Sequence, residues 1–142
     1  MNAWYMLAIY VGAILISLAL CAVSLAVMIR GVVRKKSLGG RLAFLIAAGV
    51  VTAAVLLFTN SHATYYRFND WIVSSSTAQD IVKRYGEPDI DRYTPGKGGS
   101  LWYYIYTDNG PIMPDHLDHY YYIALDANGK VTEIMEDVRP GG

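Results

Sequence analysis

Two long apolar runs without a charged residue constrain this chain more than any other feature. One covers residues 3–29 and the other residues 42–59. An α-helix rises about 1.5 Å per residue, so roughly 20 apolar residues cross a hydrocarbon core about 30 Å thick. Backbone amides find no water in that core, so both runs should be helical. The sequence therefore predicts a transmembrane hairpin over residues 1–59.

The stretch between the two runs, residues 30–41, is basic. It holds five of the twelve Lys and Arg residues and no acid. Short loops rich in Lys and Arg stay on the cytoplasmic side, so we predict a two-pass protein of the bacterial cytoplasmic membrane with both termini extracytoplasmic. Small residues at four-residue spacing predict close packing of the two helices; they are Ala8, Gly12, Ala22, Ala26, Gly49 and Ala53.

Residues 60–142 have a different composition and are predicted to form one extracytoplasmic α+β domain. They hold all twelve Asp and Glu residues but only seven of the twelve Lys and Arg residues, which gives a formal charge of −5. An acidic domain lacks the basic footprint that nucleic-acid binding requires. We therefore expect the partners to be the lipid bilayer and another envelope or membrane protein, and not a nucleic acid.

Local patterns in this region predict one clear helix and a meander of three strands. Thr77 can cap a helix whose apolar stripe ends at Tyr85, with Gly86 as its positive-φ stop and Pro88 preventing continuation. A short amphipathic segment over residues 68–72 precedes it. Aromatic and β-branched residues predict strands over residues 101–106, 120–125 and 130–136, with a flexible glycine-rich loop over residues 95–99. The expected fold is a helix packed on a three-stranded antiparallel sheet.

The order of these motifs resembles the BamE-like (SmpA/OmlA) domain family over roughly residues 75–138. The matching pieces are Thr77 to Tyr85-Gly86-Glu87-Pro88, then Trp102-Tyr103-Tyr104, then Leu125-Asp126-Ala127-Asn128-Gly129-Lys130-Val131. The sequence departs from the family where Ser75-Ser76 replaces Gly-Met and where Tyr85 replaces Leu. The resemblance implies a small extracytoplasmic scaffold that binds protein or envelope surfaces without catalysis. It does not extend to the hairpin or to membership of a particular complex.

No motif of an enzyme is present, and we expect neither catalytic residues nor a cofactor. The sequence lacks Gly-x-Ser-x-Gly, His-Glu-x-x-His and P-loop patterns. The loop between the aromatic strands does contain nitrogen and oxygen donors, but without an ordered ligand spacing. We therefore predict no metal site, with four residues as weak candidates: Asp115, His116, Asp118 and His119.

The aromatic strands carry more apolar side chains than one helix can cover. One face of the sheet is therefore predicted to contact a protein partner through Trp102, Tyr104, Tyr106 and Tyr121, or through their alternating neighbours. The function that follows is a membrane-tethered, non-catalytic binding module, such as a small subunit or assembly factor of an envelope complex. The alternative is a metal- or ligand-sensing domain that signals through the hairpin.

Overall fold

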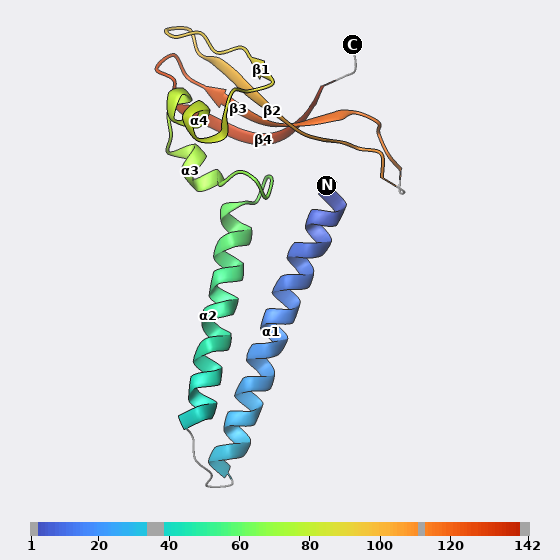
Figure 1. Cartoon of the computed structure of the whole chain (residues 1–142), viewed down its shortest axis with the longest axis vertical. Coiled ribbons are helices and arrows are strands. Elements are labelled where there is room, and N and C mark those ends of the chain that lie inside the picture. Colours follow the sequence, from blue (N-terminus) through green and yellow to red (C-terminus); the bar gives the residue numbers. More distant parts are fainter. Residues whose placement is uncertain (1–2, 34–38, 111–112, 140–142) are drawn as a thin grey trace. The chain divides into compact units, whose positions relative to one another are not determined.

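The computed structural model describes residues 3–33, 39–110 and 113–139. The chain divides into two compact units. One consists of Leu7–Asn60, and the other consists of Ser61–Gly142 together with Met1–Met6. The first contains two long helices, and the second contains two short helices and a four-stranded sheet (Figure 1).

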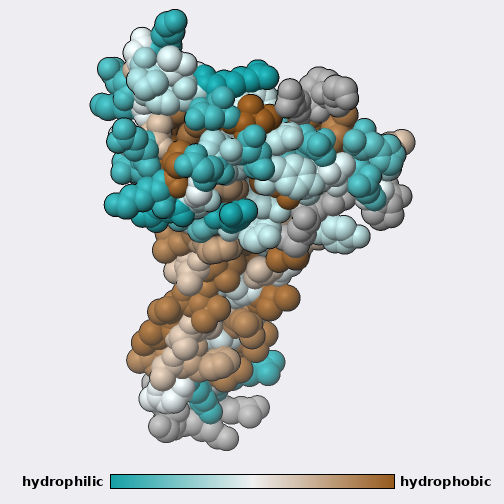
Figure 2. Space-filling view, turned by 45° about the horizontal axis from the view of Figure 1, so that its top comes forward, coloured by the Kyte–Doolittle hydropathy of each residue, from teal (hydrophilic) through white to brown (hydrophobic). Residues whose placement is uncertain are grey.

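Helices α1 (Ala3–Val33) and α2 (Gly39–Ser61) are each long and apolar enough to cross a membrane. Their outer surface is hydrophobic, whereas polar residues dominate the surface of the sheet-containing unit (Figure 2). Both helices extend into the basic stretch that was predicted to be a loop over residues 30–41. Arg30 lies in the last turn of α1, and Arg41 lies near the start of α2. Residues 34–38 of that predicted loop lie outside the described residues.

The contact between α1 and α2 is polar at its centre, and the predicted stripe of small residues does not form it. Apart from the backbone of the same helix turn, no heavy atom lies within 4 Å of a Cβ built on Gly12 or Gly49. Instead the buried Thr52 hydroxyl lies 3.2 Å from the Ser17 carbonyl oxygen and 3.1 Å from the Cys21 sulfur. In lipid, hydroxyl, thiol and carbonyl groups bond to one another because the hydrocarbon offers no hydrogen-bond partner. The positions of these polar residues therefore mark the helix contact better than the spacing of Ala and Gly does.

The second unit is an antiparallel meander with two short helices. The sheet order is β1-β2-β3-β4, so each strand pairs with its neighbour in sequence. The elements are α3 (Asp70–Ser74), α4 (Ala78–Tyr85), β1 (Ile90–Asp91), β2 (Gly99–Thr107), β3 (Asp118–Leu125) and β4 (Val131–Arg139). The prediction of a three-stranded sheet was wrong by one strand. β1 has only two residues and lies among acids and a proline, so no sequence pattern predicts a strand there.

The ends of α4 confirm the sequence prediction. Thr77 caps its first turn, and Asp80 completes the capping box by accepting from the Thr77 backbone. The Thr77 hydroxyl, which donates to the carboxylate at 2.7 Å, lowers the pKa of Asp80. Gly86 follows the helix at φ +91° and ψ −178°, a region that is nearly exclusive to glycine. Local chemistry therefore sets the length of this helix.

The core lies on the sheet face covered by α3 and α4 (Figure 1). Phe68 is fully buried and stacks on Tyr121 with ring centroids 4.2 Å apart. The buried Tyr121 hydroxyl donates to Asp70 at 2.7 Å. Burial and this hydrogen bond raise the pKa of Tyr121 well above its ordinary value. Burial likewise raises the pKa of Tyr103 to about 12. The segment that precedes α3 is therefore an integral part of the domain core.

Candidate functional site

The four aromatic residues proposed as a contact surface lie on two different faces of the sheet. Strict alternation along β2 would place Trp102, Tyr104 and Tyr106 on one face. The register shifts between Tyr104 and Tyr106, where Tyr104 pairs with Tyr120 but Tyr106 pairs with His119. This bulge turns Tyr106 onto the core face.

Tyr106 and Tyr121 are therefore removed from the candidate contact surface. Tyr121 pairs with Tyr103 across the sheet and is fully buried against Phe68. Tyr106 is 6 % exposed, and its hydroxyl donates to Glu136. A side chain packed inside its own domain offers no surface to a partner, so these two tyrosines belong to the core.

Trp102 and Tyr104 lie on the opposite face with two tyrosines of β3. We call the surface formed by Trp102, Tyr104, Tyr120 and Tyr122 the open face. Its rings meet edge to face. The centroid of the Trp102 ring lies 4.8 Å from that of Tyr122 and 5.9 Å from that of Tyr120, and the centroids of Tyr104 and Tyr120 are 5.8 Å apart. Edge-to-face contact is a favoured geometry for aromatic rings and stabilises this arrangement. Tyr104 is 42 % exposed, and the other three are half-buried, so the open face is ordered and accessible.

Carboxylates lie at the edges of the open face. Register places Asp137 beside Tyr120, and Glu133 lies beside Ala124, two positions after Tyr122 on the same face. Asp118 pairs with Thr107, whose hydroxyl also lies 2.8 Å from the Tyr104 hydroxyl. Among the described side chains, the Arg92 guanidinium lies 5.8 Å from the centre of the Trp102 ring. Register also pairs Arg139 with Asp118. The open face is thus aromatic at its centre and mainly acidic at its rim.

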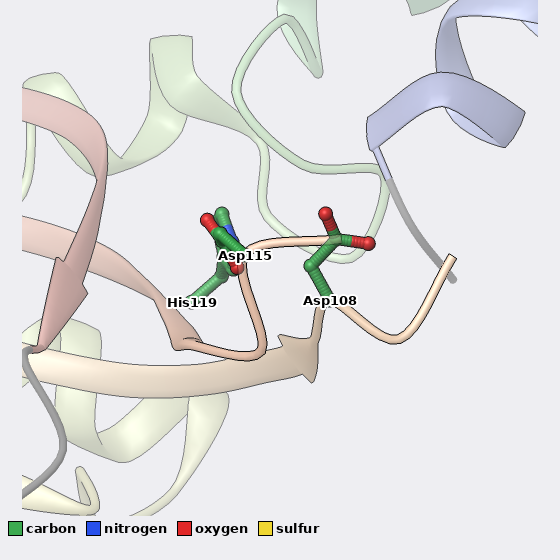
Figure 3. Close-up of side chains that lie close together, drawn as sticks. All are labelled: Asp108, Asp115 and His119. Atoms are coloured by element: carbon green, nitrogen blue, oxygen red, sulfur yellow. The ribbon is translucent and has the colours of Figure 1, made fainter. Parts of the chain in front are cut away.

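A second cluster of chemically active side chains lies at the β2–β3 loop. Asp108 follows β2, Asp115 lies within the loop and His119 lies on β3, and the three side chains are close together (Figure 3). One donor atom from each lies within 4.8 Å of the donors of the other two. Asp115 and His119 are two of the four weak metal candidates from the sequence, and the structure brings these two together with Asp108.

The remaining two weak candidates point elsewhere. His116 Nδ1 lies 3.0 Å from the Asn109 side-chain oxygen, and Asp118 accepts from the Thr107 hydroxyl at 2.6 Å. No local pattern in the sequence marks Asp108, because it is eleven positions before His119 and only the pairing of β2 with β3 brings the two together. Thr107 pairs with Asp118 at the end of that ladder, and this pair places the neighbouring residues Asp108 and His119 close together.

His119 is held on three sides. Its ring stacks on Tyr106 with centroids 4.5 Å apart and an interplanar angle of 12°. Its Nδ1 lies 2.7 Å from Glu136 Oε1, and its Nε2 lies 3.2 Å from Asp115 Oδ2. The Leu117 backbone N–H and, less strongly, His119 lower the pKa of Asp115, so this carboxylate is ionised at neutral pH.

Comparison with known proteins finds no matching family model, no matching curated protein and no matching solved structure.

Proposed function

We propose that this protein is a membrane-tethered, non-catalytic binding module whose open face contacts a protein partner outside the cytoplasm. The observation that carries the proposal is the ordered aromatic cluster around Trp102, which stays accessible on the sheet face opposite the core. Tyrosine and tryptophan are enriched at protein contacts because they bury a large area at a small cost in side-chain entropy. The BamE-like resemblance of residues 75–138 belongs to this proposal and implies the same kind of activity.

The partner that fits the open face is a protein segment with both apolar and basic side chains. Aromatic rings at the centre offer apolar burial, and Glu133, Asp137 and Asp118 at the rim favour Lys or Arg. A bilayer surface fits less well, because anionic headgroups repel a unit of charge −5. An envelope or membrane protein is therefore the proposed occupant, in keeping with a small subunit or assembly factor.

The proposed topology places the basic residues between the two spans in the cytoplasm and the acidic unit outside it. Five Lys and Arg residues between two apolar helices, with every acid after the second helix, support this orientation. A reporter that is active only outside the cytoplasm should be active when fused after Gly142. A fusion that accumulates stably but remains silent would contradict the proposed orientation.

The contact itself is tested with a photoreactive amino acid placed at position 104 of the full chain in intact membranes. We expect one discrete protein adduct. It should be lost when Trp102→Ala removes the centre of the open face, and also when Glu133→Lys and Asp137→Lys reverse its rim charge.

Trp71 provides the matched control, because it is 53 % exposed but lies on α3 and outside the open face. The probe at position 71 should not give the same adduct, and Trp71→Ala should leave the adduct from position 104 unchanged. Adducts with lipid alone, or an adduct insensitive to both the Trp102 and the rim substitutions, would refute the proposed contact.

A further inference from the structure

We propose that Asp108, Asp115 and His119 form a binding site for a divalent transition-metal cation such as zinc. The site lies at the β2–β3 loop and uses none of the four residues of the open face. It therefore does not depend on the proposed protein contact. It revises the expectation from sequence that no metal site is present, and it gives specific content to the sensor alternative.

The strongest argument comes from the two nitrogens of His119. Both face carboxylate oxygens, with Nδ1 2.7 Å from Glu136 and Nε2 3.2 Å from Asp115. A neutral imidazole carries one N–H, and the shorter contact places it on Nδ1 as donor to Glu136. The Nε2 lone pair is then directed toward Asp115, where a cation would be ligated by both groups. A protonated His119 would pair with the same two carboxylates, so the zinc titration is designed to distinguish a cation from a proton.

The arrangement around Nδ1 is the one that metal-binding histidines use. Such a histidine commonly donates its other N–H to a carboxylate, which fixes the tautomer and aims the free lone pair at the metal. Glu136 is placed for this role, and it also accepts from the Tyr106 hydroxyl at 2.5 Å. Stacking on Tyr106 holds the plane of the imidazole. Glu136 is therefore a positioning residue for His119.

Distances between the donors suit a small cation. Ligands about 2.0–2.2 Å from a metal are roughly 3–3.5 Å apart in tetrahedral or octahedral geometry. Nε2 of His119 and Oδ2 of Asp115 are 3.2 Å apart, and every donor pair of the cluster lies within 4.8 Å. The Asp108 side chain accepts from the Gly110 N–H at 3.1 Å, and it would have to turn toward Asp115 and His119 to join the set. One nitrogen and two oxygen donors without thiolate suit Zn²⁺ or Mn²⁺ and leave coordination positions open to water or a ligand.

The backbone of the loop already holds the donors near one another. The Asp108 N–H donates to the Leu117 carbonyl at 3.1 Å, and the His116 N–H donates to the Asp108 carbonyl at 3.0 Å. Asp115 accepts from the Leu117 N–H at 2.8 Å. A site organised in this way loses little conformational entropy when the cation binds.

The test is a calorimetric zinc titration of the full chain in detergent micelles after chelator treatment. We expect one saturable Zn²⁺ per chain and a rise in melting temperature with zinc, because a cation that binds only the folded state stabilises it. His119→Ala should abolish both effects. Glu136→Gln should weaken zinc binding by about 10–100-fold, the usual effect of losing a histidine-orienting carboxylate. Its melting temperature in chelator measures the separate cost of weakening the contacts of Glu136 with Tyr106 and His119, and the zinc-dependent rise is compared with that baseline.

His116→Ala is the matched control, because the His116 side chain contacts Asn109, and its backbone bond to the Asp108 carbonyl is kept in the variant. It should bind zinc as the parent chain does. The proposal is overturned if the parent shows no saturable binding, as expected when a proton alone occupies the site. It is also overturned if His116→Ala and His119→Ala lower the affinity equally, since this would indicate nonspecific coordination by surface histidines.

Discussion

Replacing Phe68 by alanine is expected to lower the free energy of unfolding of the sheet-containing unit by about 3–5 kcal/mol. Phe68 has no exposed surface, and its ring contacts those of Tyr85, Tyr103 and Tyr121 with centroids 4.9, 5.4 and 4.2 Å away. Alanine would leave a cavity among three rings that are held by their own hydroxyl contacts. The surrounding structure can therefore close the cavity only in part.

Trp71→Ala is the control for this substitution. Trp71 is also a large aromatic residue, three positions along the chain, but it is 53 % exposed. Its removal should change stability by less than about 1 kcal/mol, as is usual for exposed sites. Denaturant unfolding of the full chain in micelles, followed by near-ultraviolet circular dichroism, compares the two midpoints. Similar midpoints for both variants would show that Phe68 does not organise the core.

Gly99→Ala is expected to destabilise the same unit by about 3 kcal/mol or more, through a backbone clash combined with a strained φ. Gly99 adopts φ +143°, and a Cβ at this position would lie 2.0 Å from the carbonyl oxygen of Arg92. That oxygen belongs to the main chain next to β1, where the Arg92 N–H donates to the Ser100 carbonyl at 2.9 Å. Relief of the clash would therefore separate β1 from β2.

Gly96→Ala tests the same loop without the clash. Gly96 also has a positive φ, at +81°, but a Cβ added there would have no heavy atom within 4 Å. Only the backbone strain remains, about 1–2 kcal/mol. The two variants should differ clearly in melting temperature. If the two variants have the same melting temperature, the loop is able to move away from Arg92 without a cost in stability.

Features that depend on neighbouring residues could be predicted from the sequence. The two apolar helices follow from hydropathy, and α4 follows from Thr77, Asp80 and Gly86, all within ten residues. The Asp126–Gly129 turn between β3 and β4 is also stabilised by residues close in sequence, because the Asp126 side chain accepts from the backbone N–H groups of Asn128 and Lys130. These hydrogen bonds, the Lys130 contact foremost, lower the pKa of Asp126.

Features that depend on register could not be predicted in the same way. The bulge after Tyr104 moves Tyr106 to the core face, and no residue in the aromatic run marks the position. Glu136 meets His119 only because β3 pairs with β4, seventeen positions along the chain. A shift of one residue in either ladder would exchange the faces. The sequence could therefore show that the strands are rich in aromatic residues, but it could not show on which face of the sheet each ring lies.

The order of strands in the meander has a consequence for how the domain folds. Each pairing joins neighbouring strands, so the sheet forms by closing short loops, which costs little chain entropy. The bond from Tyr121 to Asp70 instead spans 51 positions. Closing a loop of that length costs about 1.5 kcal/mol more than closing one of about ten residues. The hairpins can therefore form first and provide the template on which the Phe68 segment docks.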